Sequence, residues 1–226
     1  MRVYIDFDNT VTLKDVLSQL IERFSINDDW KALEDAWELG EISAKECLIG
    51  QMKGVRIYQG ELGEYLKTIE IDPYFVKLVD FLKEKGIEFS IVSDNFESMI
   101  RTILDYSDIK GVPVYANHLR IFRNRLFPSF PYENPDCGLC AHCKKVHFMQ
   151  DPHSMEDPII YVGDGQSDIC PARDADIVLA KGRLLKYFKK HKLSCIEFND
   201  LNGVYEYLKE GLMAWCPSDQ KALKCY

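Results

Sequence analysis

The first ten residues, Met1–Thr10, read MRVYIDFDNT. The apolar run Val3–Phe7 predicts a short buried β-strand. Asp6 and Asp8 lie two positions apart near its end, and alternate residues of a strand point to the same face, so the two carboxylates are held close together. Two like charges at this separation are unfavourable unless a cation lies between them. The stretch therefore predicts the first strand of a sheet, with a cation-binding site where that strand ends.

After this strand, short apolar runs alternate with amphipathic helical patterns. Further strands are expected at residues 87–92, 112–116, 159–162, 177–180 and 195–198, with a hairpin at 119–127. Helices are expected at residues 74–85, 96–106, 144–149, 168–173, 186–191 and 201–208. Strands that alternate with helices favour a mainly parallel, doubly wound α/β sheet.

Residues 13–72 interrupt this alternation. Helical spacing of apolar residues is found at 13–24, 30–39 and 44–52, without a convincing strand among them. Because ligands bind at the carboxyl edge of open α/β sheets, we expect a small helical cap over that edge, inserted after the first strand. A long helical crossover is the alternative. The predicted α/β core comprises residues 1–12 and 73–226, the cap residues 13–72, and a cysteine-rich loop residues 135–148 of the core.

The composition is that of an ordinary globular protein, with 46% hydrophobic and 28% charged residues in a chain of 226. The net charge of −8 argues against a nucleic-acid surface, which needs a basic patch to neutralise phosphates. No apolar run approaches the ~20 residues that span a bilayer, and a first strand at Arg2 or Val3 leaves no room for a signal peptide. We therefore expect a cytoplasmic protein without nucleic-acid or membrane partners. The sequence contains no pattern that indicates an oligomeric state.

Four segments carry polar residues at or near the carboxyl ends of predicted strands. They are DFDNT (Asp6–Thr10), IVSDN (Ile91–Asn95), a lysine at position 144 or 145, and YVGDGQSD (Tyr161–Asp168). Carboxylates of Asp6 and Asp164 can share one Mg²⁺, which prefers oxygen ligands. A carboxylate is also a competent nucleophile towards phosphorus. Asp8 can exchange a proton with the leaving and attacking oxygens, and Ser93 and the lysine can hold the phosphoryl oxygens.

In this order, the motifs resemble those of haloacid dehalogenase superfamily phosphatases of the phosphoserine-phosphatase-like branch. The matching parts are DxDxT at Asp6–Thr10, the strand-end Ser93, the lysine, and GDGxxD at Gly163–Asp168. The tract VYANHL (Val114–Leu119) is also similar to that branch. The resemblance implies Mg²⁺-dependent hydrolysis of a small phosphorylated metabolite through an aspartyl-phosphate. The second carboxylate, Asp8, weighs against the dehalogenases of the superfamily, which lack it.

The resemblance also implies roles for individual residues. Asp6 is the expected nucleophile, Asp8 the acid and base, and Ser93 and Lys144 the phosphate contacts. The expected metal ligands are Asp6, Asp8 through its carbonyl, Asp164 and Asp168; for Asp168 the alternative is to orient the lysine or a metal-bound water. Further contacts to substrate or phosphate are expected from Thr10, Asp94, Asn95 and Gln51. Lys144 is preferred over Lys145 because it directly follows the cysteine run.

Residues 135–148, PDCGLCAHCKKVHF, contain a Cys-x2-Cys-x2-Cys run at Cys137, Cys140 and Cys143. Thiolates at this spacing can surround Zn²⁺, and His147, one helical turn beyond Cys143, can close the tetrahedron. Such a site would rigidify the loop that delivers Lys144. The alternative is an irregular loop with three free thiols.

The substrate depends on the predicted cap. The phosphoserine branch clamps the substrate carboxylate with a cap arginine, and GEISAKECLIGQM (Gly40–Met52) places the uncharged Gln51 at that position, which disfavours phosphoserine. CGLCAHCKK and VGDGQSDICPARDADIVLAKGRLL resemble methionine-salvage phosphatases of 2-hydroxy-3-keto-5-methylthiopentenyl-1-phosphate, whereas Ser93–Asn95 resembles phosphocholine and phosphoethanolamine phosphatases. Glu41 and Trp37 are further cap candidates. A phosphotransferase and an inactive zinc-bound scaffold are the alternative functions.

Overall fold

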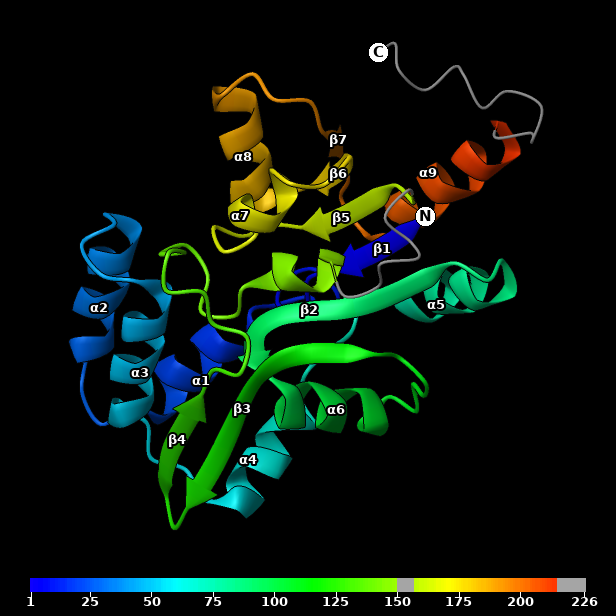
Figure 1. Ribbon diagram of the computed structural model, residues 1–226. Coiled ribbons are helices and arrows are strands. Elements are labelled where there is room, and N and C mark those ends of the chain that lie inside the picture. The colour runs from blue at the N-terminus through cyan, green and yellow to red at the C-terminus, as the bar shows by residue number, and fades with distance from the viewer. Residues whose placement is uncertain (150–156, 215–226) are drawn as a thin grey trace.

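The computed structural model describes residues 1–149 and 157–214. This part of the chain contains a seven-stranded sheet in the order β4-β3-β2-β1-β5-β6-β7 (Figure 1). The strands are β1 (Arg2–Ile5), β2 (Glu88–Phe96), β3 (Val114–Phe122), β4 (Arg125–Ser129), β5 (Ile159–Gly163), β6 (Ile177–Ala180) and β7 (Ile196–Glu197). Neighbouring strands are parallel except β3 and β4. The predicted mainly parallel sheet is confirmed, and β1 lies between β2 and β5, where the strand order reverses and such sheets bind ligands.

Two strands are longer than the sequence predicts. β2 continues through Phe96, and its register against β3 shifts between Ser93 and Phe96. β3 runs without interruption through both the predicted short strand and the first arm of the predicted hairpin. The outer half of β3 alternates apolar and polar residues and pairs with β4, and the hairpin turns at Arg123-Asn124 as predicted, with Arg123 at φ 56°.

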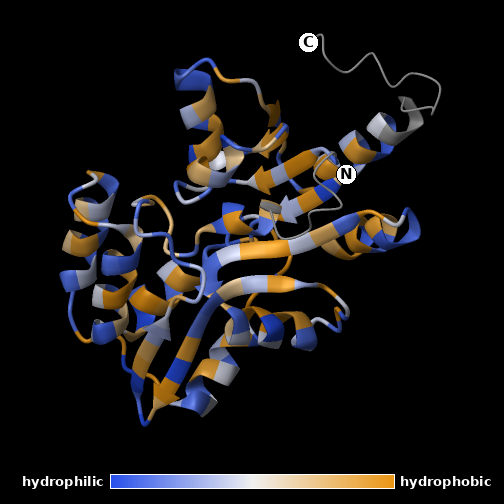
Figure 2. Cartoon of the chain, viewed as in Figure 1, coloured by the Kyte–Doolittle hydropathy of each residue, from blue (hydrophilic) through white to orange (hydrophobic). Residues whose placement is uncertain are grey.

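The helices that follow the strands agree closely with the prediction. They are α5 (Phe75–Glu84), α6 (Glu97–Tyr106), the 3-10 helix η1 (Lys144–Met149), α7 (Ile169–Ala172), α8 (Gly182–Lys190) and α9 (Leu201–Ala214). α8 begins at Gly182 rather than at residue 186, and the fully buried Leu184 anchors its first turn. Apolar residues predominate in the inner strands, whereas the helices carry both apolar and polar residues (Figure 2).

Four further helices lie between β1 and β2: α1 (Val16–Phe24), α2 (Asp29–Glu38), α3 (Ala44–Gly54) and α4 (Gln59–Leu66). The N-cap of α3 is Ser43, whose side chain forms a capping box with Glu46. α3 packs against α2 and against β4. β1 and β5 point toward the side of the molecule where α1, α2 and α3 lie (Figure 1). The expected helical insertion after the first strand is thus present.

The buried apolar residues of α1 and α3 belong to the same cluster as those of the sheet. An isolated bridge between Thr12 and Ile71 joins the two ends of the inserted segment. The division into a core of residues 1–12 and 73–226 and a cap of residues 13–72 stays a prediction. Among the described residues, no helix is long and apolar enough to cross a membrane.

Candidate active site

Asp6 and Asp8 follow β1 in a tight turn that the carbonyl of Phe7 closes. This carbonyl accepts hydrogen bonds, at 2.9–3.2 Å, from the backbone N–H groups of Thr10, Val11 and Thr12. Asn9 has a φ of 54°, a left-handed conformation that asparagine adopts more readily than most residues. The turn brings the side chains of both Asp6 and Asp8 to the wall of one cavity.

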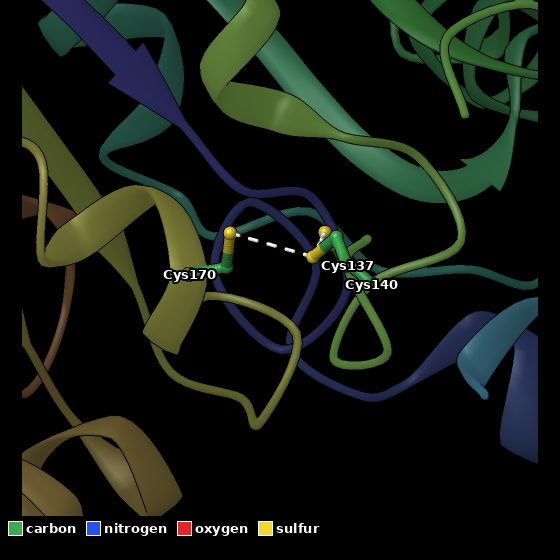
Figure 3. Close-up of side chains that lie close together, drawn as sticks. All are labelled: Cys137, Cys140 and Cys170. Carbon is green, nitrogen blue, oxygen red and sulfur yellow. Dashed lines mark hydrogen bonds between the residues drawn. The ribbon is translucent and has the colours of Figure 1, made fainter. Parts of the chain in front are cut away.

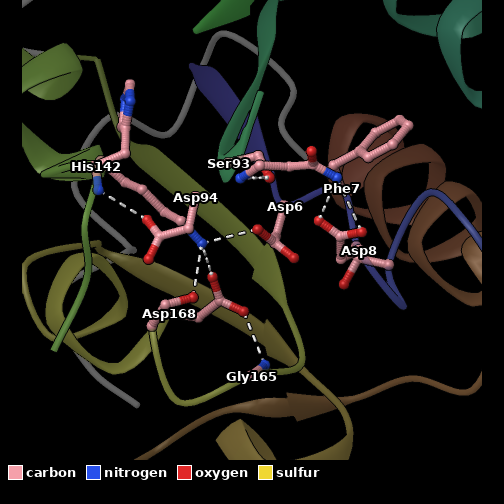
Figure 4. Close-up of polar contacts among 12 residues, drawn as sticks. Asp6, Phe7, Asp8, Ser93, Asp94, His142, Gly165 and Asp168 are labelled. Atoms are coloured by element: carbon pink, nitrogen blue, oxygen red, sulfur yellow. Dashed lines mark hydrogen bonds and ion pairs between the residues drawn. The ribbon is translucent and has the colours of Figure 1, made fainter. Parts of the chain in front are cut away.

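Lys144 is the cation of this site. Its side chain is fully buried, and its Nζ lies 2.7 Å from Oδ1 of Asp6 and 2.5 Å from Oδ1 of Asp168 (Figure 4). Burial opposes the charge, but Asp168 and Asp6 raise the pKa of Lys144 well above its ordinary value. Lys145 instead pairs with Asp174 at the surface, at 3.1 Å. The structure therefore brings Lys144, and not Lys145, to the carboxylates.

Asp168 lies behind the cavity wall and is held by four donors. Its Oδ1 accepts hydrogen bonds from Lys144 and from the Tyr161 hydroxyl, at 2.5 and 2.6 Å. Its Oδ2 accepts from the backbone N–H groups of Asp164 and Gly165, at 2.9 and 2.8 Å. A Cβ at Gly163 would lie 2.5 Å from this oxygen, which explains the first glycine of GDG. With its acceptor positions occupied, Asp168 is better placed to orient Lys144 than to bind a metal.

Asp6, Asp164 and Asp168 bring carboxylate oxygens within 4.8 Å of one another. Asp6 and Asp164 also line the cavity. They are hard oxygen donors at a suitable spacing for one Mg²⁺. The hydroxyl of Thr10, a buried residue, donates to Oδ1 of Asp164 at 3.2 Å. Thr10 therefore braces the metal-facing carboxylate and does not line the cavity.

The carboxylate of Asp8 is turned away from this group of acids. Its Oδ1 accepts a hydrogen bond from the backbone N–H of Val16 at 2.7 Å, and its Oδ2 accepts one from Nδ2 of Asn95 at 2.9 Å. Asp8 is expected to reach the metal through its carbonyl, and its side chain is not among the carboxylates that the structure brings together. Asn95, expected among the phosphate contacts, is fully buried and lies against Asp8.

Burial raises the pKa values of the acids in this site. It raises those of Asp6 and Asp8 well above their usual range, with like charges such as Asp168 beside Asp6 adding to the effect. Burial, followed by the Asp168 charge, raises the pKa of Asp164 to about 7. A divalent cation between the carboxylates would favour their charged forms and lower these pKa values again.

The end of β2 supplies Ser93 and Asp94 to the cavity wall. Ser93 is buried, and its Oγ accepts a hydrogen bond from the backbone N–H of Asn95 at 3.1 Å. Asp94 accepts hydrogen bonds from the backbone N–H groups of Ala141 and His142, at 2.8 and 2.9 Å. Burial raises the pKa of Asp94 to about 6. Asp94 thus fixes the cysteine-rich loop against β2.

A cavity of about 450 Å³ lies between the acidic side chains of the site and the helices α1, α2 and α3. Of the predicted cap candidates, Gln51 and Trp37 line it, whereas Glu41 does not and is exposed. Sequence reasoning missed several lining residues: Asp15, Trp30, Glu34, Arg183 and Lys186. These residues do not form a sequence motif with one another, because they come from helices and loops that are distant in sequence and meet at the cavity only in the folded protein.

The cysteine-rich loop has a different neighbour from the one expected. Sγ of Cys137 lies 3.3 Å from Sγ of Cys140 and 3.4 Å from Sγ of Cys170, which is the second residue of α7 (Figure 3). His147, the predicted fourth zinc ligand, is not part of this group. Its Nε2 lies 2.8 Å from Nε2 of His142, and its ring stacks on Tyr115. Cys170 has no metal-ligand spacing to the loop cysteines in the sequence, which predicts an ordinary core or tail thiol; the fold instead places it against Cys137.

Known proteins are similar to this chain in sequence and in fold. The model of the family described as Putative Phosphatase matches residues 1–196. The bifunctional enzyme MtnB/MtnX of Bacillus licheniformis is 26% identical over 92% of the chain, which spans only 49% of that enzyme's length. The 2-hydroxy-3-keto-5-methylthiopentenyl-1-phosphate phosphatase of Bacillus velezensis is 25% identical, with 89% of this chain and 87% of that one covered. A solved phospho-aspartyl intermediate analogue of phosphoserine phosphatase has the same fold, with a TM-score of 0.68 and 18% identity over 91% of this chain and 97% of that one.

Proposed function

The chain belongs to the Putative Phosphatase family, in the haloacid dehalogenase superfamily and close to its methionine-salvage phosphatases, and we propose that it is a Mg²⁺-dependent phosphomonoesterase acting through an aspartyl-phosphate on Asp6. One observation carries the proposal. Asp6 faces the cavity with Lys144 at 2.7 Å and Asp164 beside it, so a nucleophile, a cation and a metal ligand meet at one point.

In the first half of the proposed reaction, a carboxylate oxygen of Asp6 attacks phosphorus and forms the acyl-phosphate bond. The bond from phosphorus to the ester oxygen breaks, and Asp8 donates its proton to that oxygen. The raised pKa of Asp8 suits a group that must hold a proton at this stage. Lys144 and Ser93 offset the charge on the transferred phosphoryl group.

In the second half, water attacks the phosphorus of the aspartyl-phosphate. Asp8, now ionised, takes the proton from this water, and inorganic phosphate leaves while Asp6 is regenerated. Asn95 and the N–H of Val16 hold Asp8 in place for both transfers. Mg²⁺, when held by Asp6 and Asp164 with the carbonyl of Asp8, supplies positive charge that binds a phosphate oxygen and offsets the repulsion between the carboxylates.

The alcohol part of the substrate would occupy the part of the cavity that α2 and α3 line. A small metabolite like that of the methionine-salvage relatives is the first candidate. An aminoalkyl phosphate such as phosphocholine or phosphoethanolamine is the second, because Trp30, Trp37 and Glu34 line the cavity, and aromatic faces with a carboxylate attract an ammonium group. Gln51 carries no charge for the carboxylate of phosphoserine, so recognition of phosphoserine would have to come from Arg183 or Lys186, which also line the cavity.

A panel of phosphate monoesters with Mg²⁺, and 4-nitrophenyl phosphate as a generic substrate, tests the proposal. We expect release of inorganic phosphate without any acceptor alcohol, and retention of a phosphoryl group on acid-quenched enzyme by mass spectrometry. Asp6→Asn should abolish both, whereas Asp174→Asn, a surface control, should change neither. Full turnover by Asp6→Asn contradicts the mechanism. Strict dependence on an acceptor alcohol favours a phosphotransferase, and stoichiometric zinc without any phosphatase activity favours a scaffold.

A further inference from the structure

Three cysteine thiols from two separate segments meet near the active site, and a fourth cysteine lies next to them. Cys137, Cys140 and Cys143 come from the cysteine-rich loop and Cys170 from α7. The sulfur atoms of Cys137, Cys140 and Cys170 all lie within 4.8 Å of one another (Figure 3). Cys143 is not in this group of three, but it is buried three residues after Cys140 and its side chain interacts with that of Cys140. Cys140 and Cys143 are buried, and Cys137 and Cys170 are partly exposed.

The spacing of these sulfur atoms suits a shared metal ion. In a tetrahedral zinc site with Zn–S bonds of about 2.3 Å, two sulfur atoms are about 3.8 Å apart. Cys137 lies 3.3 Å from Cys140 and 3.4 Å from Cys170, somewhat closer than this. A disulfide needs a sulfur separation of about 2.05 Å and joins only two of the four thiols. One zinc ion can be bound by all four cysteines.

Cysteine binds a metal ion as its thiolate, so four cysteine ligands bring excess negative charge to one place. Lys145 directly follows Lys144 and lies close to Cys170. This ammonium group offsets part of the excess negative charge of a metal with four thiolates.

We propose that Cys137, Cys140, Cys143 and Cys170 bind one structural Zn²⁺. Four thiolate ligands fill the tetrahedron and leave no open position for substrate or water, so the ion has a structural rather than a catalytic role. This site is separate from the carboxylates that would hold Mg²⁺.

The zinc site would connect the two segments that deliver the buried ion pair. Lys144 directly follows the ligand Cys143, and Asp168 precedes the ligand Cys170 by two residues. Their side chains meet at 2.5 Å. The ion thus fastens the cysteine-rich loop to α7 at the point where Lys144 enters the active site, and its loss should disturb Lys144 without removing any group that contacts phosphate.

The zinc content of the protein tests this inference. Full-length protein is purified under reducing conditions without chelator, and its metal is measured by elemental analysis and by native mass spectrometry. We expect one zinc per chain in the wild type and in Asp6→Asn, so the result does not depend on the proposed catalysis. Cys170→Ser should lose the zinc, whereas Cys195→Ser and His147→Ala should keep it. Co²⁺ exchanged into the wild type should give the absorption of a tetrahedral tetrathiolate.

Three results would overturn the proposal. The first is wild-type protein that is free of zinc and takes up none from added Zn²⁺. The second is a Cys170→Ser variant that keeps zinc at the wild-type affinity. The third is loss of zinc in His147→Ala together with a Co²⁺ spectrum that indicates nitrogen ligation, which would restore the histidine as fourth ligand. The Co²⁺ spectrum is measured on the wild type, so it decides the ligand set even if Cys170→Ser does not fold.

Discussion

Lys144 and Asp168 form an ion pair in which neither side chain has any solvent exposure, with Nζ 2.5 Å from Oδ1. The pair connects the cysteine-rich loop to the turn after β5, and Lys144 extends it to Asp6. Removing one partner of a buried pair leaves a charge without compensation, which costs far more than an exposed pair contributes. The strongest prediction for stability and activity therefore concerns Lys144.

We expect Lys144→Met to lower the free energy of unfolding by about 3–5 kcal/mol, because Asp168 and Asp6 lose their cation. We also expect it to lower kcat by at least ~100-fold, since the charge opposite the phosphoryl group is lost. Urea unfolding and turnover of 4-nitrophenyl phosphate measure the two effects. Lys145→Met is the matched control, because its partner Asp174 is exposed; it should change stability by less than ~1 kcal/mol. Equal effects of the two variants would contradict the assignment of Lys144.

Asn95 should control the proton transfers of Asp8. Its Nδ2 donates to both carboxylate oxygens of Asp8, at 2.9 and 3.2 Å, and this contact lowers the pKa of Asp8 against the effect of burial. Asn95→Ala removes the contact, so the pKa of Asp8 should rise further. Because Asp8 must be ionised to activate water, the acidic limb of the kcat profile should move to higher pH.

The measurement is the pH dependence of kcat with 4-nitrophenyl phosphate, whose good leaving group makes hydrolysis of the phosphoenzyme the sensitive step. We also expect kcat at its optimum to fall about 10-fold. Asn202→Ala, which removes an exposed contact to Lys77, serves as the control. An acidic limb that stays in place or moves to lower pH would refute this role for Asn95.

The buried acids should make the metal-free protein less stable as pH rises. Burial raises the pKa of Asp94 to about 6 and that of Asp164 to about 7. Between the ordinary aspartate pKa of about 3.9 and these values, the folded protein binds more protons than the unfolded chain. Stability therefore decreases with increasing pH across this window. With EDTA present, we expect the free energy of unfolding to fall by a few kcal/mol, on the order of one per unit of pKa shift, between pH 4 and pH 7.

Mg²⁺ should reverse the part of this loss that comes from Asp164, because the ion binds ionised carboxylates. Asp164→Asn should therefore be more stable than the wild type in EDTA at pH 7, and it should show little further gain on addition of Mg²⁺. Urea unfolding with EDTA or Mg²⁺ at several pH values checks both statements. If Asp164→Asn gains as much from Mg²⁺ as the wild type does, Asp164 is not a metal ligand.

Short motifs at strand ends were sufficient to predict the sheet and to name Asp6, Lys144, Asp164 and Asp168, whose side chains the structure brings together, because each strand-end motif contains both a strand and the residues that follow it. Helix α4, QGELGEYL, was not predicted, since two glycines weaken its helical pattern. Partners from distant segments were also missed. Asn95 lies 87 positions from Asp8 in the sequence, and Cys170 lies 33 from Cys137. Such contacts depend on how the strands are ordered in the sheet, which the local pattern does not contain.

Glu34 should distinguish between the two substrate candidates. It lines the cavity together with Trp30 and Trp37, and burial followed by the charge of Glu38 raises its pKa. A carboxylate beside aromatic rings attracts an ammonium group by about 1–2 kcal/mol, or roughly a factor of 5–30 in affinity.

If the substrate is an aminoalkyl phosphate, Glu34→Gln should lower kcat/KM for phosphocholine by about 10-fold and change that for 4-nitrophenyl phosphate less than about twofold. Glu41→Gln, on the same side of the molecule but off the cavity, should alter neither value. A Glu34→Gln variant that loses equally on both substrates would exclude recognition of an ammonium group by Glu34. A phosphate ester without an ammonium group, like that of the methionine-salvage relatives, would then be the better candidate.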